Sequence, residues 1–313
     1  MKRYSWAKSG ARIGASLLLL LLATARGALA ADPLVNVDWV KANLEKPGIV
    51  MIDFRPPTEY LRGHIPGAVN SNYAKDGWRE ERADKVPDVL PAKLEPLAAM
   101  IGKLGIDNKT RVVLVPPGAS STDMGIGTRV YWTFKVLGHD NVSVLDGGMA
   151  AWEKDKKNPL QAGAAKPAEG KAFQVALRKE MVVTMDDVRK AKAAGVMLVD
   201  NRPEDQYVGI NRHPKATESG TIEGARNLSH VWTTVNGGGE FRKPAQLAQL
   251  YKVAGVPTSG DQINFCNTGH WASIGWFVSH ELMGNKQARM YDGSMVEWTM
   301  LKGGSMEQKV KLQ

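Results

Sequence analysis

Residues 49–55 have the sequence IVMIDFR, and residues 196–202 have the matching sequence VMLVDNR. Each is a short apolar run closed by Asp-x-Arg, and a tyrosine follows each run at the same distance, as Tyr60 and Tyr207. Short apolar runs rich in Val and Ile are typical of buried strands. The two runs therefore predict one strand that occurs twice, and they indicate a chain built from two copies of one unit.

Three further matches follow in the same order along both copies, which argues for duplication of a whole domain. GHIPGA at 63–68 corresponds to GTIEGA at 220–225, the run 111–115 to 262–266, and DGGMAAW at 146–152 to DGSMVEW at 292–298. Short β-rich runs alternate with helical patterns, such as the capping-box sequence at Thr184 that opens a helix to about Ala194. This alternation predicts an α/β fold with a parallel sheet in each copy.

The chain also shows how the two copies are delimited. Residues 1–30 have a basic start, the apolar run Leu17–Leu22 and a small-residue cleavage site at Ala28–Ala30, the pattern of a secretory signal. We expect a periplasmic or secreted protein with no stable membrane insertion after cleavage, because that run is too short to span a bilayer. The expected domains are 31–155 and 173–313, joined by an exposed linker at 156–172 that is rich in Lys, Pro, Gly and Ala.

Charge and cysteine content narrow the function. The formal net charge is +9, but five basic residues lie in the signal, and acids are interleaved with the remaining basic residues. This pattern is typical of a solvated surface, so we expect no nucleic-acid partner, whereas small anionic substrates would suit the mild positive balance. The only cysteine, Cys266, cannot form an internal disulfide and is a lone thiol in an oxidising compartment.

Cys266 lies in the loop CNTGHW at 266–271, between a predicted buried strand at 262–265 and a predicted helix at 272–283. A tight loop from the carboxyl end of a strand into a helix turns backbone N–H groups inward, where they stabilise an anion. We therefore expect a thiolate nucleophile at Cys266, with Gly269 supplying a positive φ. The alternative is a buried, inert cysteine that packs as a small apolar residue.

The ordered motifs resemble the tandem rhodanese family of thiosulfate and 3-mercaptopyruvate sulfurtransferases over essentially the whole mature chain. The resemblance implies two tandem rhodanese-like domains, each a parallel sheet flanked by helices. It also implies that the first domain is catalytically silent, because Val115-Pro116-Pro117 stands where the second copy has its cysteine. The implied reaction moves sulfane sulfur from a small anionic donor, through a Cys266 persulfide, to a thiophilic acceptor such as cyanide, a thiol or a protein thiol. Neither a metal nor an organic cofactor is needed.

The resemblance also implies a set of donor-binding residues. Arg202 matches the arginine that holds the donor's anionic group in the family, although it could instead pair with Asp200, as Arg55 must pair in the silent copy. His270 could supply a switchable positive charge or only cap the loop. The donor stays open between thiosulfate and mercaptopyruvate, because Asn267 and Thr268 are neutral where relatives carry other loop residues. The expected donor-binding residues are Arg202, Asn267, Thr268, Gly269, His270 and Trp271.

Other motif residues are expected to pin loops, namely Asp53, His64, Asp200, Asp292 and Trp298. The insert at 209–219 is expected either to overhang the pocket or to be a solvated loop.

Two other functions compete with sulfur transfer. A cysteine phosphatase needs an arginine six positions after the cysteine, and Ala272 stands there. A non-catalytic persulfide carrier or sulfur-sensing protein would use the same cysteine, so the sequence leaves that alternative open.

Overall fold

The computed structural model describes residue 1, residues 31–165 and residues 169–312. Apart from Met1, the expected signal at 1–30 lies outside these residues. Within the described part of the chain, no helix is long and apolar enough to cross a membrane.

The first half of the chain forms a five-stranded parallel sheet in the order β1-β5-β4-β2-β3. Its central strands are covered by helices on both faces, which explains why their sequences are apolar throughout rather than alternating. The strands are β1 (Leu34–Val35), β2 (Ile49–Asp53), β3 (Val69–Asn70), β4 (Arg111–Val115) and β5 (Val142–Leu145). The helices are α1 (Val37–Lys41), α2 (Pro57–Arg62), α3 (Glu95–Lys103), α4 (Ser121–Val136) and α5 (Gly148–Lys154).

The second half repeats this sheet in the order β6-β11-β10-β7-β9, again with parallel pairs. Its strands are β6 (Val182–Val183), β7 (Met197–Asp200), β9 (Arg226–Asn227), β10 (Gln262–Phe265) and β11 (Ala288–Tyr291), with β8 (Thr221–Ile222) and β12 (Met306–Glu307) as a separate antiparallel pair. The α-helices are α6 (Met185–Ala193), α7 (Glu204–Tyr207), α8 (Pro244–Ala254), α9 (His270–Trp276) and α10 (Ser294–Met300). Shorter turns are η1 (Lys179–Met181), η2 (His230–Thr233), η3 (Val235–Gly237) and the π-helical η4 (Phe277–Leu282). The α/β class and the two parallel sheets are confirmed.

Local signals in the sequence explain several helix limits. The capping box at Thr184 forms as expected, with the hydroxyl accepting from Asp187 N–H and the Asp187 carboxylate accepting in return. The helix after the cysteine loop begins at His270, two residues before the predicted start, and continues as the π-helical turn η4.

The strand pairing in each sheet matches the two copies one residue differently from the sequence alignment of 111–115 with 262–266. Asp53 pairs with Val115 in β2–β4, and Asp200 pairs with Phe265 in β7–β10, so Val115 is the counterpart of Phe265. The residue at the position of Cys266 is therefore Pro116. The conclusion that the first copy has no thiol at this position is unchanged.

The segment between the halves belongs mostly to the first domain. Gln161 pairs with His64 as an isolated bridge, and Phe173 packs edge-on against Phe134. Further along, Arg178 forms an ion pair of 2.6 Å with Asp140. Residues 173–178 thus pack against the first half, where Phe173 is buried beside Phe134.

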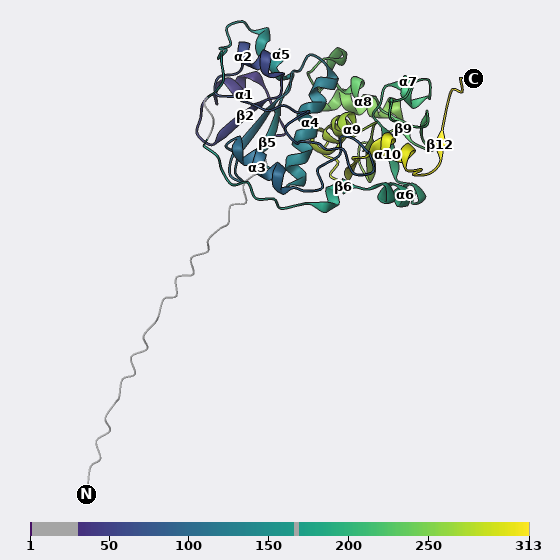
Figure 1. Ribbon diagram of the computed structural model, residues 1–313. Coiled ribbons are helices and arrows are strands. Elements are labelled where there is room, and N and C mark those ends of the chain that lie inside the picture. The colour runs from purple at the N-terminus through teal and green to yellow at the C-terminus, as the bar shows by residue number, and fades with distance from the viewer. Residues whose placement is uncertain (2–30, 166–168, 313) are drawn as a thin grey trace.

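The two halves meet along helices α4 and α9, which lie side by side at the centre of the molecule (Figure 1). Thr128 on α4 and Ser273 on α9 share a hydrogen bond of 2.7 Å, and the Tyr131 ring meets Phe277 edge-on with 5.0 Å between centroids. Both helices begin at the carboxyl ends of the central strands. Their contact therefore brings the cysteine loop of the second domain against the first domain.

Each half also extends one long loop over the other, between an edge strand of its sheet (β3 or β9) and the α-helix that follows it (α3 or α8). The first arm comprises residues 71–92, and the second arm comprises residues 228–241. The Leu90 N–H of the first arm donates to Asp292 at 2.7 Å, and the Phe241 N–H of the second arm donates to Asp146 at 2.9 Å. Asp146 and Asp292 open the matching motifs at 146–152 and 292–298, so the exchange of arms follows the internal repeat.

Candidate active site

Cys266 lies directly after β10, at the floor of a pocket of about 310 Å³ between the two halves. Its side chain is 1 % exposed. Both halves contribute to the walls of this pocket, which are formed by Tyr73, Arg79, Thr122, Asp123, Ile126, His213, Asn267, Thr268, His270 and Trp271.

The loop after Cys266 surrounds the sulfur with backbone N–H groups. Those of Asn267, Thr268, Trp271 and Ala272 act on the thiol and oppose the rise in its pKa that burial causes. Gly269 turns the chain with a φ of 78° and is the N-cap residue of α9, where no side chain caps the helix. The N–H groups at this end of the helix are therefore available to a sulfur anion.

The corresponding helix of the first domain begins differently. The Ser120 hydroxyl accepts from Asp123 N–H at 3.1 Å, and the Asp123 carboxylate accepts from Ser120 N–H at 3.0 Å, so a full capping box closes the start of α4. Pro116 stands at the position of Cys266 and has neither a thiol nor an N–H. The first copy thus has neither a thiol at this position nor an uncapped helix end that could hold its anion.

The hydroxyl group of Ser294 anchors the cysteine loop by hydrogen bonds to its backbone. Its hydroxyl accepts from Cys266 N–H at 3.1 Å and from Gly269 N–H at 3.2 Å, and it donates to the Tyr291 carbonyl at 2.8 Å. To reach this place Ser294 adopts a φ of 51°, an uncommon value for a residue other than glycine. The loop is therefore fixed before any substrate arrives.

The expectation of a thiolate in the empty site is not met. Burial raises the pKa of Cys266 above its ordinary value, and the four N–H groups offset only part of this rise. Removing the thiol from water disfavours its charged form more than the loop's dipoles favour it. The resting group is thus a thiol that becomes a thiolate as pH rises.

Arg202 is not among the residues that line the pocket, and its guanidinium makes the pairing with Asp200 that was the alternative to holding the donor. Its Nε and Nη2 hold the Asp200 carboxylate at 2.6–3.1 Å, and Nη2 also donates to the Gly220 carbonyl at 2.7 Å. Arg202 is 1 % exposed and Asp200 is fully buried. Every contact that the structure gives the guanidinium is made inside the second domain, so Arg202 pins the loop around Gly220.

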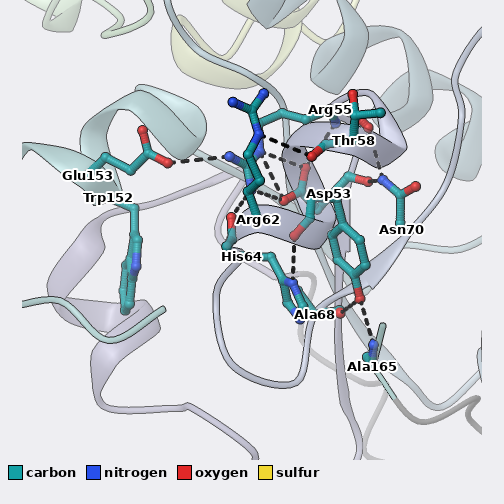
Figure 2. A network of polar contacts seen from close by, with 12 residues as sticks. Asp53, Arg55, Thr58, Arg62, His64, Ala68, Asn70, Trp152, Glu153 and Ala165 are labelled. Atoms are coloured by element: carbon teal, nitrogen blue, oxygen red, sulfur yellow. Dashed lines mark hydrogen bonds and ion pairs between the residues drawn. The ribbon is translucent and has the colours of Figure 1, made fainter. Parts of the chain in front are cut away.

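The silent domain contains the same arrangement. Arg55 lies against Asp53 and Glu153 (Figure 2). Its Nη2 donates to the Asp53 carboxylate at 2.7 Å and to the Gly63 carbonyl at 2.7 Å. His64, in the same view, bonds through Nδ1 to the Tyr60 carbonyl at 2.9 Å. The twin geometry in a domain without a thiol supports the structural role of Asp-x-Arg in both copies.

His270 lies in the pocket wall, and of the two roles left open for it, the structure does not favour a positive charge at neutral pH. Its Nε2 is 2.9 Å from the Thr122 carbonyl, which can only accept, so Nδ1 is left to accept from the Tyr73 hydroxyl at 3.2 Å. Desolvation, with the nearby charges of Arg79 and Arg129, lowers the pKa of His270 to about 4. At neutral pH the imidazole is therefore neutral and bridges the two domains.

Among the other predicted loop residues, Asn267, Thr268 and Trp271 line the pocket and Gly269 does not. Asn267 donates to the Gln206 side chain at 2.8 Å, and Trp271 donates from Nε1 to the Thr122 hydroxyl at 3.2 Å. The Trp271 ring also stacks on His230, with 4.5 Å between centroids. Thr268 completes the set of loop residues in the wall.

The insert at 209–219 contributes His213 to the pocket wall, while its Lys215 pairs with Glu81 of the first arm at 3.0 Å. This segment therefore overhangs the pocket and contacts the first domain.

The first domain supplies pocket residues that sequence analysis did not identify. Tyr73 and Arg79 come from the first arm, and Thr122, Asp123 and Ile126 come from the start of α4. Nothing in the repeat marks them, because they matter only through the contact of one copy with the other. The one available signal was the pairing of two domains, which places a loop of each against the end of the other's sheet.

A buried ion pair lies behind the cysteine loop. Arg129 on α4 is 1 % exposed, and its Nη1 is 2.5 Å from Oδ1 of Asp292. A Cβ atom added at Gly269 would lie 2.2 Å from this Nη1, so only glycine fits there. Asp292 therefore pins a loop, as expected, and it also joins the two domains.

A fold of this kind, with a lone cysteine held in a loop of N–H groups at a helix start, defines a two-domain α/β protein with a candidate cysteine nucleophile. Comparison with known proteins supplies the family. The description "Rhodanese-like domain" matches residues 36–155 and 184–301, and the chain therefore belongs to the rhodanese family with two tandem domains.

Relatives and solved structures agree with this assignment. The chain is 32 % identical over 290 residues to a Haloferax volcanii protein provisionally named a thiosulfate sulfurtransferase, covering 89 % of this chain and 97 % of the relative. It is 31 % identical to the sulfur carrier protein TtuD of Thermus thermophilus, over 87 % of this chain and 95 % of the relative. The 3-mercaptopyruvate sulfurtransferase SseA of Escherichia coli shares the fold, with a TM-score of 0.69 at 23 % identity over 84 % of this chain and 99 % of that structure. The protein is a sulfurtransferase that moves sulfur from a donor to a thiophilic acceptor.

Proposed function

We propose that Cys266 is the residue that carries the sulfur, as a persulfide, and that the donor is a small anionic sulfane compound. The observation that carries this proposal is the setting of Cys266. It is the only thiol of the chain, it forms the floor of the pocket between the domains, and the backbone N–H groups of its own loop act on its sulfur. Thiolates, not thiols, attack sulfur, and these groups favour an anion at that atom.

The proposed step balances without a cofactor. Cys266 loses its proton to solvent and attacks the outer sulfur of the donor, forming a new S–S bond. The bond between that sulfur and the rest of the donor breaks, and the leaving group departs with the electron pair. The N–H groups that favour the thiolate then face the persulfide anion, and a thiophilic acceptor removes the outer sulfur and regenerates Cys266.

Intact mass spectrometry tests the carrier directly. Incubation with thiosulfate should add the mass of one sulfur atom to the wild-type protein, and cyanide should remove it. Cys266→Ser should fold and show no such addition, because a hydroxyl neither ionises near neutrality nor forms a persulfide. A sulfur adduct on the serine variant would contradict the assignment of Cys266.

A second experiment separates an enzyme from a non-catalytic carrier. One relative is named a sulfur carrier protein, so a persulfide alone does not distinguish the two roles. Repeated turnover of thiosulfate or mercaptopyruvate with cyanide supports the enzyme. A single stoichiometric transfer, with no turnover by any small donor, would instead favour the carrier.

We also propose that the protein is exported and works in the periplasm or outside the cell. The support is the basic and apolar pattern of residues 1–30 with a small-residue site at Ala28–Ala30. Cell fractionation and N-terminal sequencing test this. A mature chain that starts near Ala31 in the exported fraction is expected, and an uncleaved chain in the cytoplasm would contradict it.

A further inference from the structure

A buried arginine of the first domain lies against the cysteine loop of the second. Arg129 on α4 is 1 % exposed, and its Nη1 is 2.5 Å from the Asp292 carboxylate across the domain boundary. The same Nη1 would lie only 2.2 Å from a Cβ atom added at Gly269, so the guanidinium is in direct contact with the loop backbone. Burying an arginine is costly, and one paired acid only offsets that cost. An apolar side chain would fill the same space, so packing alone does not explain this residue.

The internal repeat shows that this arginine is not part of the shared fold. Counted from the N-cap residues of the two helices, the counterpart of Arg129 in the second domain is Val278, which is fully buried. Asp146, the counterpart of Asp292, accepts from the Phe241 N–H at 2.9 Å and forms no ion pair among the described residues. An acid at this position therefore holds the arm of the other half without an arginine. The arginine is present only in the copy of this arrangement that adjoins the cysteine.

The charge of Arg129 acts on the sulfur. Burial alone would lower the pKa of Arg129, but attraction to Asp292, to Tyr73 and to a Cys266 thiolate raises it above its ordinary value. The attraction is mutual, so the guanidinium favours a negative charge on Cys266. Arg129 is not among the residues that line the pocket. It therefore acts on the sulfur from the side of the loop and the domain boundary.

Arg129 also helps to fix the shape of the loop. Oδ1 of Asp292 pairs with Arg129, and Oδ2 accepts from the Leu90 N–H at 2.7 Å, so both oxygens of this acid are held by the first domain. Two residues further along the chain, the Ser294 hydroxyl accepts from two N–H groups of the cysteine loop at 3.1 and 3.2 Å. The position of Asp292 thus sets the position of the loop through a short stretch of backbone.

We propose that Arg129 of the first domain is a positioning residue for sulfur transfer, which holds the cysteine loop in shape and favours the anionic sulfur of Cys266. This inference rests on the proposed function, because the thiolate and then the persulfide are the anions concerned. Arg129 makes and breaks no bond, and its guanidinium keeps its proton throughout. Its contribution is a fixed positive charge, supplied by one domain to the nucleophile of the other.

The pH dependence of Cys266 alkylation by iodoacetamide tests this charge. Arg129→Met should shift the profile upward by about one pH unit. Alkylation at a fixed pH below the midpoint should then be about three- to ten-fold slower, where the lower figure allows for the greater nucleophilicity of a more basic thiolate. Arg129→Lys keeps a positive charge and should shift the profile less. The other titratable or charged groups around Cys266, which stay in place, are Asp292 and the pocket residues Tyr73, Arg79, Asp123, His213 and His270.

The shape of the profile separates charge from distortion. At high pH every variant carries a thiolate, so the rate of Arg129→Met should reach that of the wild type. A loop that is only distorted would keep the same rate ratio at every pH. An unshifted profile, or a rate ratio that does not change with pH, would overturn the proposal.

Two further variants separate this effect from the loss of an ion pair between the domains. The matched control is Arg82→Gln, because Arg82 of the first arm pairs with Glu297 of the second domain at 2.5 Å and is not in the pocket wall. It should leave the alkylation profile unchanged, and a shift as large as that of Arg129→Met would overturn the specific role of Arg129. The double variant Arg129→Met with Asp292→Asn leaves no unpaired buried acid, so urea unfolding should show higher stability than in Arg129→Met alone. It should still alkylate more slowly than the wild type; an equal rate would assign the effect to the unpaired acid and overturn the proposal.

Persulfide loading connects the charge to the reaction and separates the two proposals. The rate at which thiosulfate adds one sulfur atom to the protein, followed by intact mass at neutral pH, should fall in Arg129→Met by the same three- to ten-fold as alkylation, roughly in proportion to its thiolate. Loading at the wild-type rate would remove this inference and leave the proposed function intact. A wild-type protein that forms no persulfide would overturn the proposed function, while the alkylation profiles would still report whether Arg129 acts on the thiol.

Discussion

Replacing Arg202 by alanine should destabilise the second domain and leave donor binding unchanged. The substitution removes three contacts of 2.6–3.1 Å to the buried Asp200 and one of 2.7 Å to the Gly220 carbonyl. Asp200 would keep the Arg202 backbone N–H at 3.0 Å and the Thr221 hydroxyl at 2.8 Å. Breaking a buried ion pair by removing one partner costs about 3–5 kcal/mol. Because two donors to Asp200 remain, we expect a loss near the lower end, about 3 kcal/mol.

Urea unfolding measures this loss. With a slope of about 2 kcal/mol per M, a loss of about 3 kcal/mol lowers the midpoint by roughly 1.5 M. Arg55→Ala is the matched control, because Arg55 makes the same contacts to Asp53 and Gly63 in the first domain. It should destabilise that domain by a similar amount. The double variant Asp200→Asn with Arg202→Met should cost less than Arg202→Ala, since no unpaired buried charge is left.

Steady-state kinetics on the folded Arg202→Ala protein completes the test. We expect an unchanged KM for thiosulfate at temperatures where the variant is folded, because the guanidinium does not line the pocket. An unchanged urea midpoint together with a KM raised ten-fold or more would refute the structural role and return Arg202 to the donor site.

Three further predictions concern the cysteine loop. Alkylation of Cys266 by iodoacetamide should keep accelerating above pH 8.5, the ordinary thiol value, because burial raises its pKa; a plateau near neutrality would contradict this. The pKa values of His270 and His230 in the native protein are both lowered to about 4. As the pH falls below about 6.5, these two histidines therefore bind protons in the unfolded chain before they do so in the native protein. The free energy of unfolding should thus fall as the pH drops from about 6.5 to 4. His270→Gln should flatten part of that fall in urea unfolding at several pH values, and an identical profile would count against a neutral His270. Gly269→Ala should abolish most sulfur transfer, because the added Cβ would lie 2.2 Å from a guanidinium nitrogen of Arg129. The matched control is Gly224→Ala, where φ is similar but the space beside the residue is open. It should cost only about 1–3 kcal/mol of stability and retain sulfur transfer.

Sequence reasoning succeeds here where a pattern is local and repeated. The duplicated strand at 49–55 and 196–202, the capping box at Thr184 and the strand–loop–helix unit around Cys266 all express rules that act over a few residues. These patterns were enough to predict the α/β class, the two copies and the setting of the thiol.

It fails where the outcome depends on contacts between distant parts of the chain. Arg202 was placed in the site by analogy of motif, but its partner Asp200 is two residues away, and the identical pair in the silent copy already indicated a structural role. The neutral state of His270 depends on Thr122 and Tyr73 of the other domain. No periodicity in the sequence reveals such a pairing.

The sequence also contains a local difference between the two copies. Ser120-x-x-Asp123 is a capping-box sequence at the start of the first domain's loop helix, and the second domain has Gly269 at the corresponding position. This difference distinguishes a closed helix end from an open one, and so it distinguishes the silent copy from the active copy without any alignment of the cysteine itself.

The exchange of arms between the halves has an evolutionary consequence. Because Tyr73 and Arg79 of the first arm line the pocket around Cys266, a substitution in this arm changes the surroundings of a substrate bound in the other half. In a duplicated protein built in this way, new substrate preferences can arise from substitutions in the half without the cysteine, while the half that carries Cys266 stays unchanged.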